Sequence, residues 1–567
     1  MRVNMFRMTL RCFTLLFAMV VTLTHAQCPA DNTENCECER RFAKDYIVCE
    51  NLGNVSQIPS FNRSERVFQQ LHIRNDRTTV NTIQSNAFHG LRLYTLRFHA
   101  LGIRHIQPNA FAGLEDFVRE IYLDENSLES IPENVFSNLE QLSYLGLENN
   151  NLDSIPAHAM ADLPRLNYLN MFHNRIRTLS ADMFANLTEL VGLELHTNEI
   201  EALPAGIFSS LKSLTLLSLS SNFITTLLPD TFANLINLNR LELASNLITG
   251  IPSGAFDHVA DLRYLDISGN QITSLPDNAF DQLTRLQTLR INNNQISSLP
   301  LGLFDNMASL RKLYLNGNRI SVLQNGVFAS LQRLITLHLY NNDVTNINKE
   351  TFTGLGVVLD INFENNKLEG IPGDTFENLT TLQTLDLSNN SIRELDVNIF
   401  ASLQVIRTIK LRNNQIKTIP VGMFHDLRNL ESLYLEMNRI EVLANNTMLN
   451  LPEISYLGLH SNQIKSIATN AFGNMPQLRQ LVLYDNKLDT IPTEALRRVS
   501  IIRRVRLGMN KLSEVSEYAF AGLNLESVDL ENNEITRIYR RSFHNANRLL
   551  LINLNNKMSQ QRRSITR

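Results

Sequence analysis

LRKLYLNGNRISVLQNGVFASL, residues 310–331, is the stretch that decides the fold. Its central pattern LxLxxN, closed here by Asn318, occurs sixteen times at an unbroken spacing of 24 residues. Self-similarity at a fixed spacing over hundreds of residues predicts a solenoid, in which each repeat packs on its neighbours. We call the recurring asparagines the ladder. Its members are Asn150, Asn174, Asn198, Asn222, Asn246, Asn270, Asn294, Asn318, Asn342, Asn366, Asn390, Asn414, Asn438, Asn462, Asn486 and Asn510.

The leucines and the ladder asparagine of one repeat have different roles. Leu313 and Leu315 alternate with outward residues, which is the period of a short β-strand. The chain must then turn back over its own core, so backbone N–H and C=O groups face inward without a sheet partner. An amide side chain carries donors and an acceptor. We therefore expect each ladder asparagine to point inward and to bond such groups in its own turn and in the next repeat.

A second column, mostly phenylalanine, follows the ladder by ten residues, as Phe328 follows Asn318. Each ring needs a neighbour on both sides to be buried, so we expect a stacked hydrophobic spine. Pairs such as Ile251-Pro252 precede this column and favour extended or turn backbone. The side opposite the strands is therefore expected to be irregular or to contain short 3₁₀ turns.

Residues 1–26 have the features of a secretory signal. Basic residues precede an apolar stretch from Cys12 to Leu23, and Thr24-His25-Ala26 supplies a cleavage site. This stretch is shorter than the roughly 20 residues of a membrane-spanning helix, and no later segment is continuously apolar. The sequence predicts a secreted, extracellular chain without a membrane span; a signal anchor is the alternative.

Four cysteines remain after the signal, at Cys28, Cys36, Cys38 and Cys49. An even number in an extracellular chain predicts two disulfides, for which the spacing alone allows three connectivities. Zinc binding is the competing interpretation, but histidines are lacking nearby.

The repeats and the cysteines together predict the domain boundaries. We expect residues 27–60 to form a cysteine-rich cap, 61–557 about 21 repeats, and 558–567 a basic polar tail without a second cysteine-rich cap. Three interpretations of the arginine-rich end stay open: a charge-protected end, an edge that pairs with another protomer in a homodimer, or an incomplete sequence.

Composition argues against several classes of function. A net charge of -4 over 567 residues is unlike a nucleic-acid binder, whose footprint is a basic stripe. The chain has no nucleophile elbow, phosphate loop or HExxH motif, so we expect neither catalysis nor a cofactor. His173 and His196 fall on adjacent repeats, but two ligands without a third are weak evidence for a metal, and none is expected.

The strand face that points away from the core is the expected binding surface. Its residues lie six, four, two and one before each ladder asparagine, and nine of the thirteen tyrosines fall there. A parallel sheet is normally covered on both faces, so an open face is a natural place for a partner. Tyrosine suits such surfaces; the alternative is that it only favours strands and stacks on the neighbouring repeat. The predicted ligand-binding residues are Tyr122, Asp124, Tyr144, Glu148, Tyr168, Phe172, Tyr314, Tyr340, Lys410, Arg412, Tyr434, Tyr456 and Tyr484.

These residues form two clusters of opposite charge. The first combines aromatic and acidic side chains, which would suit a basic partner: Tyr122, Tyr144, Tyr168 and Phe172 with Asp124, Glu125, Glu148 and Glu194. The second is basic and aromatic: Lys410, Arg412, Arg504 and Arg506 with Tyr434, Tyr456 and Tyr484.

Six sequons predict N-glycosylation. They are Asn54, Asn62, Asn186, Asn378, Asn389 and Asn445. A glycan on Asn389, beside the ladder, would screen part of the strand face.

The consensus LxxLxLxxNxLxxLPxxxFxxL, together with CPADNTENCECERRFAKDYIVC at residues 28–49, resembles the extracellular leucine-rich repeat proteins of the typical 24-residue subclass. Toll receptor ectodomains, Slit, chaoptin and the acid-labile subunit are of this kind. The resemblance implies an α/β-type repeat solenoid, a horseshoe with a concave parallel β-sheet and convex irregular or 3₁₀ segments. It also implies disulfides Cys28–Cys38 and Cys36–Cys49.

For function the resemblance is broad. It implies a secreted glycoprotein that recognises protein or glycoconjugate ligands on the concave face, in innate immunity or as a soluble scaffold. The alternative is a cell-adhesion or extracellular-matrix protein with homophilic contacts.

Overall fold

The computed structural model describes residues 36–41, 44–50, 67–74, 81–160, 162–499 and 501–555. The predicted signal, the predicted tail, Cys28, Asn54 and Asn62 lie outside these ranges. The chain forms two compact units, unit 1 up to Asn270 and unit 2 from Gln271, and each is described by itself. Within the described ranges, no helix has the length and apolar character needed to cross a bilayer.

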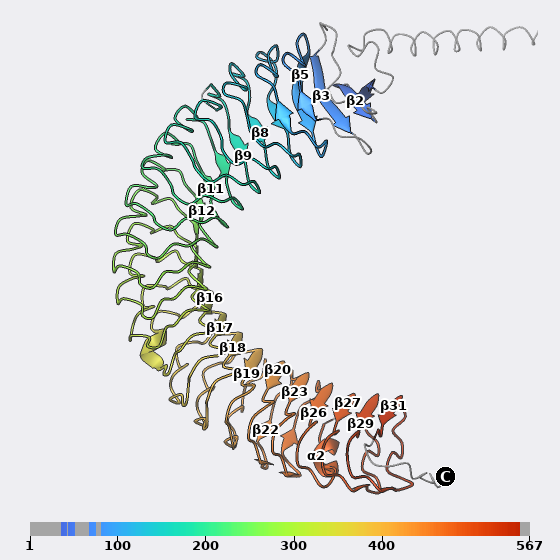
Figure 1. Ribbon diagram of the computed structural model, residues 1–567. Helices are drawn as coiled ribbons and strands as arrows, with labels where there is room; N and C mark the ends of the chain where they lie inside the picture. Colours follow the sequence, from blue (N-terminus) through green and yellow to red (C-terminus); the bar gives the residue numbers. More distant parts are fainter. Residues whose placement is uncertain are drawn as a thin grey trace, which may run out of the picture. The chain divides into compact units, whose positions relative to one another are not determined.

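Unit 1 is built on short parallel strands, one from each repeat (Figure 1). Between β8 and β9, Leu145 lies opposite Leu169 and Tyr144 opposite Tyr168, so like positions align along the sheet. The strands are β2 (Lys44–Glu50), β3 (Val67–Arg74), β5 (Arg92–Phe98), β7 (Glu120–Tyr122), β8 (Tyr144–Gly146), β9 (Tyr168–Asn170), β10 (Gly192–Glu194), β11 (Leu216–Ser218), β12 (Arg240–Glu242) and β13 (Tyr264–Asp266).

The first strand of unit 1, β1 (Cys36–Arg41), pairs antiparallel with β2 and places Cys36 opposite Cys49. The two disulfides implied by the family resemblance stay predictions.

Unit 2 repeats the same plan, with Leu313 of β15 opposite Leu337 of β16. Its sheet contains β14 (Thr288–Arg290), β15 (Lys312–Tyr314), β16 (Thr336–His338), β17 (Asp360–Asn362), β18 (Thr384–Asp386), β19 (Thr408–Lys410), β20 (Ser432–Tyr434), β23 (Tyr456–Gly458), β26 (Gln480–Val482), β27 (Arg504–Arg506), β29 (Ser527–Asp529) and β31 (Leu551–Asn553). The predicted parallel-sheet repeat solenoid is confirmed.

The side opposite the strands is irregular, as predicted. Its helical segments, in the part of the chain that the structure describes, are the 3₁₀ turn η1 (Lys349–Phe352) and the short helix α2 (Thr493–Arg497). Small parallel pairs also form there, which were not predicted: β4 (Thr82–Ile83) with β6 (His105–Ile106), β21 (Val442–Leu443) with β24 (Ser466–Ile467), β22 (Met448–Leu449) with β25 (Phe472–Gly473), and β28 (Glu514–Val515) with β30 (Arg537–Ile538).

The ladder asparagines are buried and bonded, as expected. The Asn318 amide donates to the carbonyls of Ile291 at 3.0 Å and Leu315 at 2.9 Å, and its oxygen accepts from the Ile296 N–H at 3.0 Å. One detail of the prediction was wrong, because the second repeat bonded is the preceding one and not the next. The Ile291 carbonyl finds its donor in the ladder amide of the following repeat, so each asparagine bonds back to the repeat before it.

The phenylalanine column forms the core, as expected. Phe304 and Phe328 are buried in unit 2 with ring centroids 6.1 Å apart, and Phe111 and Phe136 stack at 5.4 Å in unit 1.

A regular turn before the ladder was not predicted. From Asn149 to Met509, the residue immediately before each ladder asparagine has φ between 52° and 68°. This left-handed region suits glycine and asparagine, as at Gly317 and Asn149. Thr197 and Met437 occupy the same conformation. The excess of Asn, Gly, Asp and Ser in this column was the sequence signal that could have revealed the turn.

Candidate ligand-binding faces

The predicted tyrosines of unit 1 come together on the strand face. Tyr122 on β7 and Tyr144 on β8 lie with ring centroids 4.6 Å apart, and the Arg97 guanidinium lies 4.3 Å over the Tyr122 ring. The Tyr144 hydroxyl accepts a hydrogen bond of 2.8 Å from the Asn170 amide. The tyrosines therefore do pack on side chains of the neighbouring repeats, and these contacts hold the two rings in place. We call the pair, Tyr122 and Tyr144, the platform.

Tyr168 and Phe172 extend this platform along the next repeats. Tyr168 is 42% exposed, and its ring lies over Gly192, where a Cβ would come within 2.3 Å of Tyr168 Cε1. Phe172 stacks on His196 at 4.5 Å, and burial lowers the pKa of that imidazole. The glycine leaves the space that lets Tyr168 lie across the sheet.

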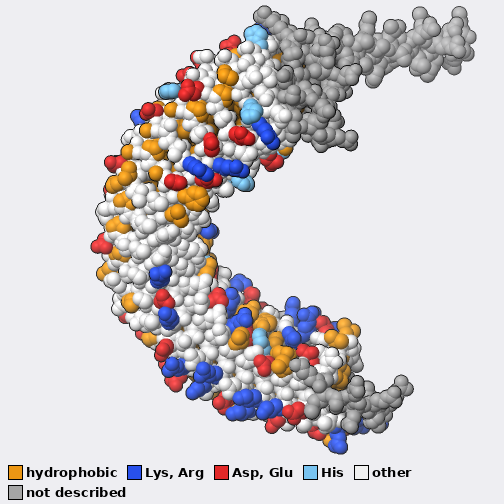
Figure 2. Space-filling model, viewed as in Figure 1, with side chains coloured by type: hydrophobic (Ala, Val, Ile, Leu, Met, Phe, Trp, Pro, Cys, Tyr) orange, Lys and Arg blue, Asp and Glu red, His pale blue; other side chains and the backbone are white. Residues whose placement is uncertain are grey.

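The acidic residues of the unit 1 face differ in their surroundings. Asp124 contacts His99 Nδ1 at 2.5 Å and is thus partly compensated. Glu148 lies beside Gly146, and its Oε2 is buried without a hydrogen-bond partner. Burial raises the pKa of Glu148. Figure 2 shows acidic, basic and histidine side chains together on this part of unit 1.

Unit 2 carries a matching arrangement. Tyr434 on β20 and Tyr456 on β23 lie with ring centroids 4.8 Å apart. At Gly458 a Cβ would come within 2.8 Å of Glu436 Oε2 and 2.9 Å of the Tyr456 hydroxyl oxygen. Glu436 is only 4% exposed, and its Oε2 has no partner. Burial raises the pKa of Glu436 and, with the Glu436 charge, that of Tyr456 to about 12.

The tyrosine pairs and the glycines of the two arrangements use the same sequence positions. Each has a tyrosine four residues before the asparagine of one repeat, a second tyrosine six residues before the asparagine of the next, and a glycine two residues after the second tyrosine. The glutamates differ, because Glu148 belongs to the repeat of the second tyrosine and Glu436 to the repeat of the first. Both tyrosine pairs and Glu148 were predicted from the sequence, whereas Gly146, Gly458 and Glu436 were not.

The predicted basic residues of unit 2 differ in whether their charge is paired within the protein. Lys410 Nζ is 3.0 Å from the buried Asp386 carboxylate, so its charge is paired. Arg412 is exposed, and its guanidinium reaches the Met437 sulfur at 3.6 Å. Arg506 lies 5.4 Å over the Tyr484 ring. Basic, histidine and hydrophobic side chains gather on this face in Figure 2.

Tyr314 and Tyr340 belong to a separate network within unit 2. His338 lies edge-on to Tyr314 at 5.2 Å and near Tyr340 at 5.9 Å, and its Nε2 is 2.9 Å from Asp360 Oδ2. Arg290 lies 4.6 Å over Tyr314. Each of these side chains already has a partner within the network. Tyr314 and Tyr340 are therefore weaker candidates for ligand binding than Tyr168 or Tyr434.

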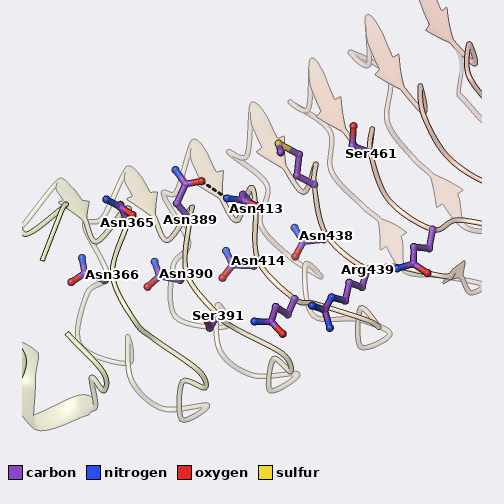
Figure 3. Close-up of a pocket in the computed structure, with 13 residues that line it drawn as sticks. Asn365, Asn366, Asn389, Asn390, Ser391, Asn413, Asn414, Asn438, Arg439 and Ser461 are labelled. Atoms are coloured by element: carbon purple, nitrogen blue, oxygen red, sulfur yellow. Dashed lines mark hydrogen bonds between the residues drawn. The ribbon is translucent and has the colours of Figure 1, made fainter. Parts of the chain in front are cut away.

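A polar groove of about 670 Å³ runs along the ladder in unit 2 and was not predicted (Figure 3). Three columns of side chains line it, one before, one at and one after the ladder. They are Asn365, Asn389, Asn413, Met437 and Ser461; Asn366, Asn390, Asn414 and Asn438; and Ser391, Gln415, Arg439 and Gln463. The ladder column is buried, and the two flanking columns look like ordinary solvated surface in any one repeat, so only the stacking of repeats reveals the groove.

The sequons within the described ranges differ in exposure. Asn186, Asn378 and Asn445 are exposed away from the strand face, whereas Asn389 is partly covered and lines the groove. Glycosylation at these positions stays a prediction. The described residues contain no group of three or more His, Cys, Asp or Glu side chains placed to hold a metal ion.

Comparison with known proteins agrees with this architecture. The family model described as "Leucine rich repeat" matches overlapping segments from residue 91 to 464, and a "BspA type Leucine rich repeat region (6 copies)" matches residues 465–565. No curated protein sequence matches the chain.

Three solved structures illustrate the likeness in fold. A chain of the Drosophila Toll–Spatzle complex is 23% identical with a TM-score of 0.68, covering 85% of this chain and 69% of that chain. The plant peptide hormone receptor RGFR1 in complex with RGF2 is 21% identical with a TM-score of 0.60, covering 92% and 83%. YopM from Yersinia enterocolitica is 21% identical with a TM-score of 0.57, covering 90% and 91%. With the family model matching most of its length, this chain belongs to the leucine-rich repeat proteins.

Proposed function

We propose that this chain is a secreted glycoprotein that binds an extracellular protein or glycoconjugate on its open strand face. It would act in innate immune recognition or as a soluble scaffold. The leucine-rich repeat fold is typical of proteins that bind rather than catalyse. Toll is seen with Spatzle and RGFR1 with RGF2, which supports a binding role for this architecture.

The observation that carries the proposal is the clustering of tyrosines on the open strand face of each unit. Tyr122 lies beside Tyr144 in unit 1 and Tyr434 beside Tyr456 in unit 2, and Tyr168 is 42% exposed. Aromatic rings that are held in place by their neighbours and still reach solvent are typical contact groups of binding surfaces. We assign ligand contacts to Tyr122 and Tyr168 on the unit 1 face and to Tyr434 on the unit 2 face.

Affinity capture tests the proposal. The intact chain is immobilised and exposed to extracellular fluid from its own source, alongside a variant carrying Tyr122→Ala, Tyr168→Ala and Tyr434→Ala. The variant should recover the specific partner at least tenfold less well. Ile236→Ala, an exposed apolar residue outside the strand face, is the matched control and should capture normally. Equal capture by the tyrosine variant would exclude the open face as the binding surface; recovery of the chain itself alone would favour adhesion.

A further inference from the structure

The polar groove of unit 2 offers a second kind of binding site. It crosses the repeats closed by Asn366, Asn390, Asn414 and Asn438, and its floor is the ladder itself (Figure 3). We propose that this groove binds a neutral β-1,4-linked oligosaccharide, with about one sugar unit for each repeat.

The amides before the ladder are oriented by one another. Asn413 donates to Asn389 at 2.8 Å, Asn389 donates to Glu364 at 2.7 Å, and Asn365 donates to Asn341 at 2.7 Å. A primary amide has two N–H donors and an oxygen with two lone pairs. After these bonds, each amide keeps bonding capacity for a ligand. Sugar hydroxyl and acetamido groups, which both donate and accept, match such a row.

The spacing between the groove asparagines of successive repeats favours a sugar chain over a peptide as the ligand. Adjacent parallel strands lie about 4.8 Å apart, whereas two residues of an extended peptide span about 6.6 Å. A peptide would therefore drift out of register within two repeats. One β-1,4-linked pyranose is close to the strand spacing in length, so successive sugars meet equivalent side chains.

The composition of the groove agrees with a neutral ligand. Arg439 is the one charged side chain among the residues that line it, which is too little for the electrostatic track of single-stranded nucleic acid. The volume of about 670 Å³ lies within the usual range for ligand sites.

Met437 adds an apolar side chain to the groove wall. It is 41% exposed and has φ of 57°, a conformation that is costly for a long side chain and comfortable for asparagine. The fold does not require methionine there, since Asn413 takes the same turn one repeat earlier. An exposed thioether at the groove wall gives the apolar face of a sugar, or an acetyl methyl group, a surface to pack on.

Titration of the full chain with defined oligosaccharides tests the site. The protein is produced in a bacterial periplasm, where disulfides form and Asn389 stays unglycosylated. Chitopentaose, cellopentaose and maltopentaose are compared by calorimetry and by saturation-transfer NMR. We expect at least one β-1,4-linked pentaose to bind at least tenfold more tightly than its dimer and than maltopentaose, whose α-linkages curve away from the row.

Variants connect the binding to the groove. Asn413→Gly with Gln415→Ala should weaken binding at least tenfold, because glycine keeps the positive φ while both amides are lost. Asn293→Gly, in the same column and unit but outside the groove, should bind normally. Absence of β-1,4 binding, equal binding of all three pentaoses, or normal binding by the groove variant would overturn the inference. The groove variant should still capture the strand-face partner normally, so failure of this inference is distinguishable from failure of the proposed function.

Discussion

A single ladder asparagine links two repeats through three hydrogen bonds. Asn318 bonds Ile291 and Ile296 in the preceding repeat and Leu315 in its own. Leucine would fill the volume but would leave two carbonyls and one N–H unpaired. The ladder asparagines thus stabilise the fold by giving buried backbone groups hydrogen-bond partners, while the leucines beside them stabilise it by burying apolar surface.

Asn318→Ala is expected to destabilise the chain by at least about 1–3 kcal/mol, because buried backbone groups lose their partners. Urea denaturation followed by circular dichroism measures the change. Arg319→Ala, at the exposed neighbouring position, is the control and should lie within about 0.5 kcal/mol of the wild type. A midpoint of Asn318→Ala equal to that of the control would contradict the role of the ladder.

The raised pKa of Glu436 predicts that the stability of the fold depends on pH. Burial raises its pKa in the folded protein, so the folded state holds the proton more tightly than the unfolded state. Its contribution to stability is therefore complete below the ordinary carboxyl pKa of about 4.3 and is lost as pH rises through the raised value. Glu436→Gln should remove this loss.

We expect Glu436→Gln to stabilise the chain relative to the wild type at about pH 7.5 and to match it near pH 4. Urea midpoints at the two pH values measure this. Glu441→Gln is the control of opposite sign, since Lys465 at 2.8 Å lowers the pKa of Glu441. A Glu436→Gln midpoint below that of the wild type at the higher pH would show that the ionised carboxylate is stabilised in the fold.

At the scale of the elements, each repeat from β7 to β29 combines a three-residue strand of the main sheet with a left-handed turn. The strand was predictable because Leu313 and Leu315 alternate with period two. The turn was missed, because its signal is spread over several residue types: Asn, Gly, Asp and Ser are in excess at this position, but Thr197 adopts the same conformation. The backbone N–H of the turn residue donates to the following repeat, as Gly317 does to the Tyr340 carbonyl at 2.9 Å, and this bond does not depend on the side chain.

Thr197 shows the cost of this turn. A β-branched residue at φ of 56° is strained, whereas asparagine tolerates the conformation. Thr197→Asn should raise the free energy of unfolding by about 1 kcal/mol. Thr225→Asn, an exposed threonine outside the positive-φ positions, should give no gain. Equal effects of the two substitutions in thermal denaturation would argue that the turn stores no strain.

The binding faces were predictable only in part, because the surroundings of each side chain are set by neighbouring repeats. The periodicity placed Tyr144 and Tyr456 outward, but their contacts depend on side chains one or more repeats away. Tyr168 lies across the sheet because Gly192, 24 residues later, lacks a side chain. Glu436 is buried although it occupies an outward position, since Tyr456 and Gly458 of the next repeat close over it.

For the whole molecule, the fold follows from a repeat that cannot bury its core alone. Each unit stacks leucine and phenylalanine columns inside and leaves one strand face without a covering layer. The family assignment and the likeness to the Toll–Spatzle and RGFR1 structures establish the architecture, and the account assigns ligand binding to the open face.

Hydroxyl-radical footprinting of the full chain, alone and with its captured partner, tests this assignment most directly. We predict that oxidation of Tyr122, Tyr168 and Tyr434 falls on binding, while that of exposed Leu301 and Val421, outside the strand face, stays the same. Protection of Leu301 and Val421 with unchanged oxidation of the three tyrosines would contradict it.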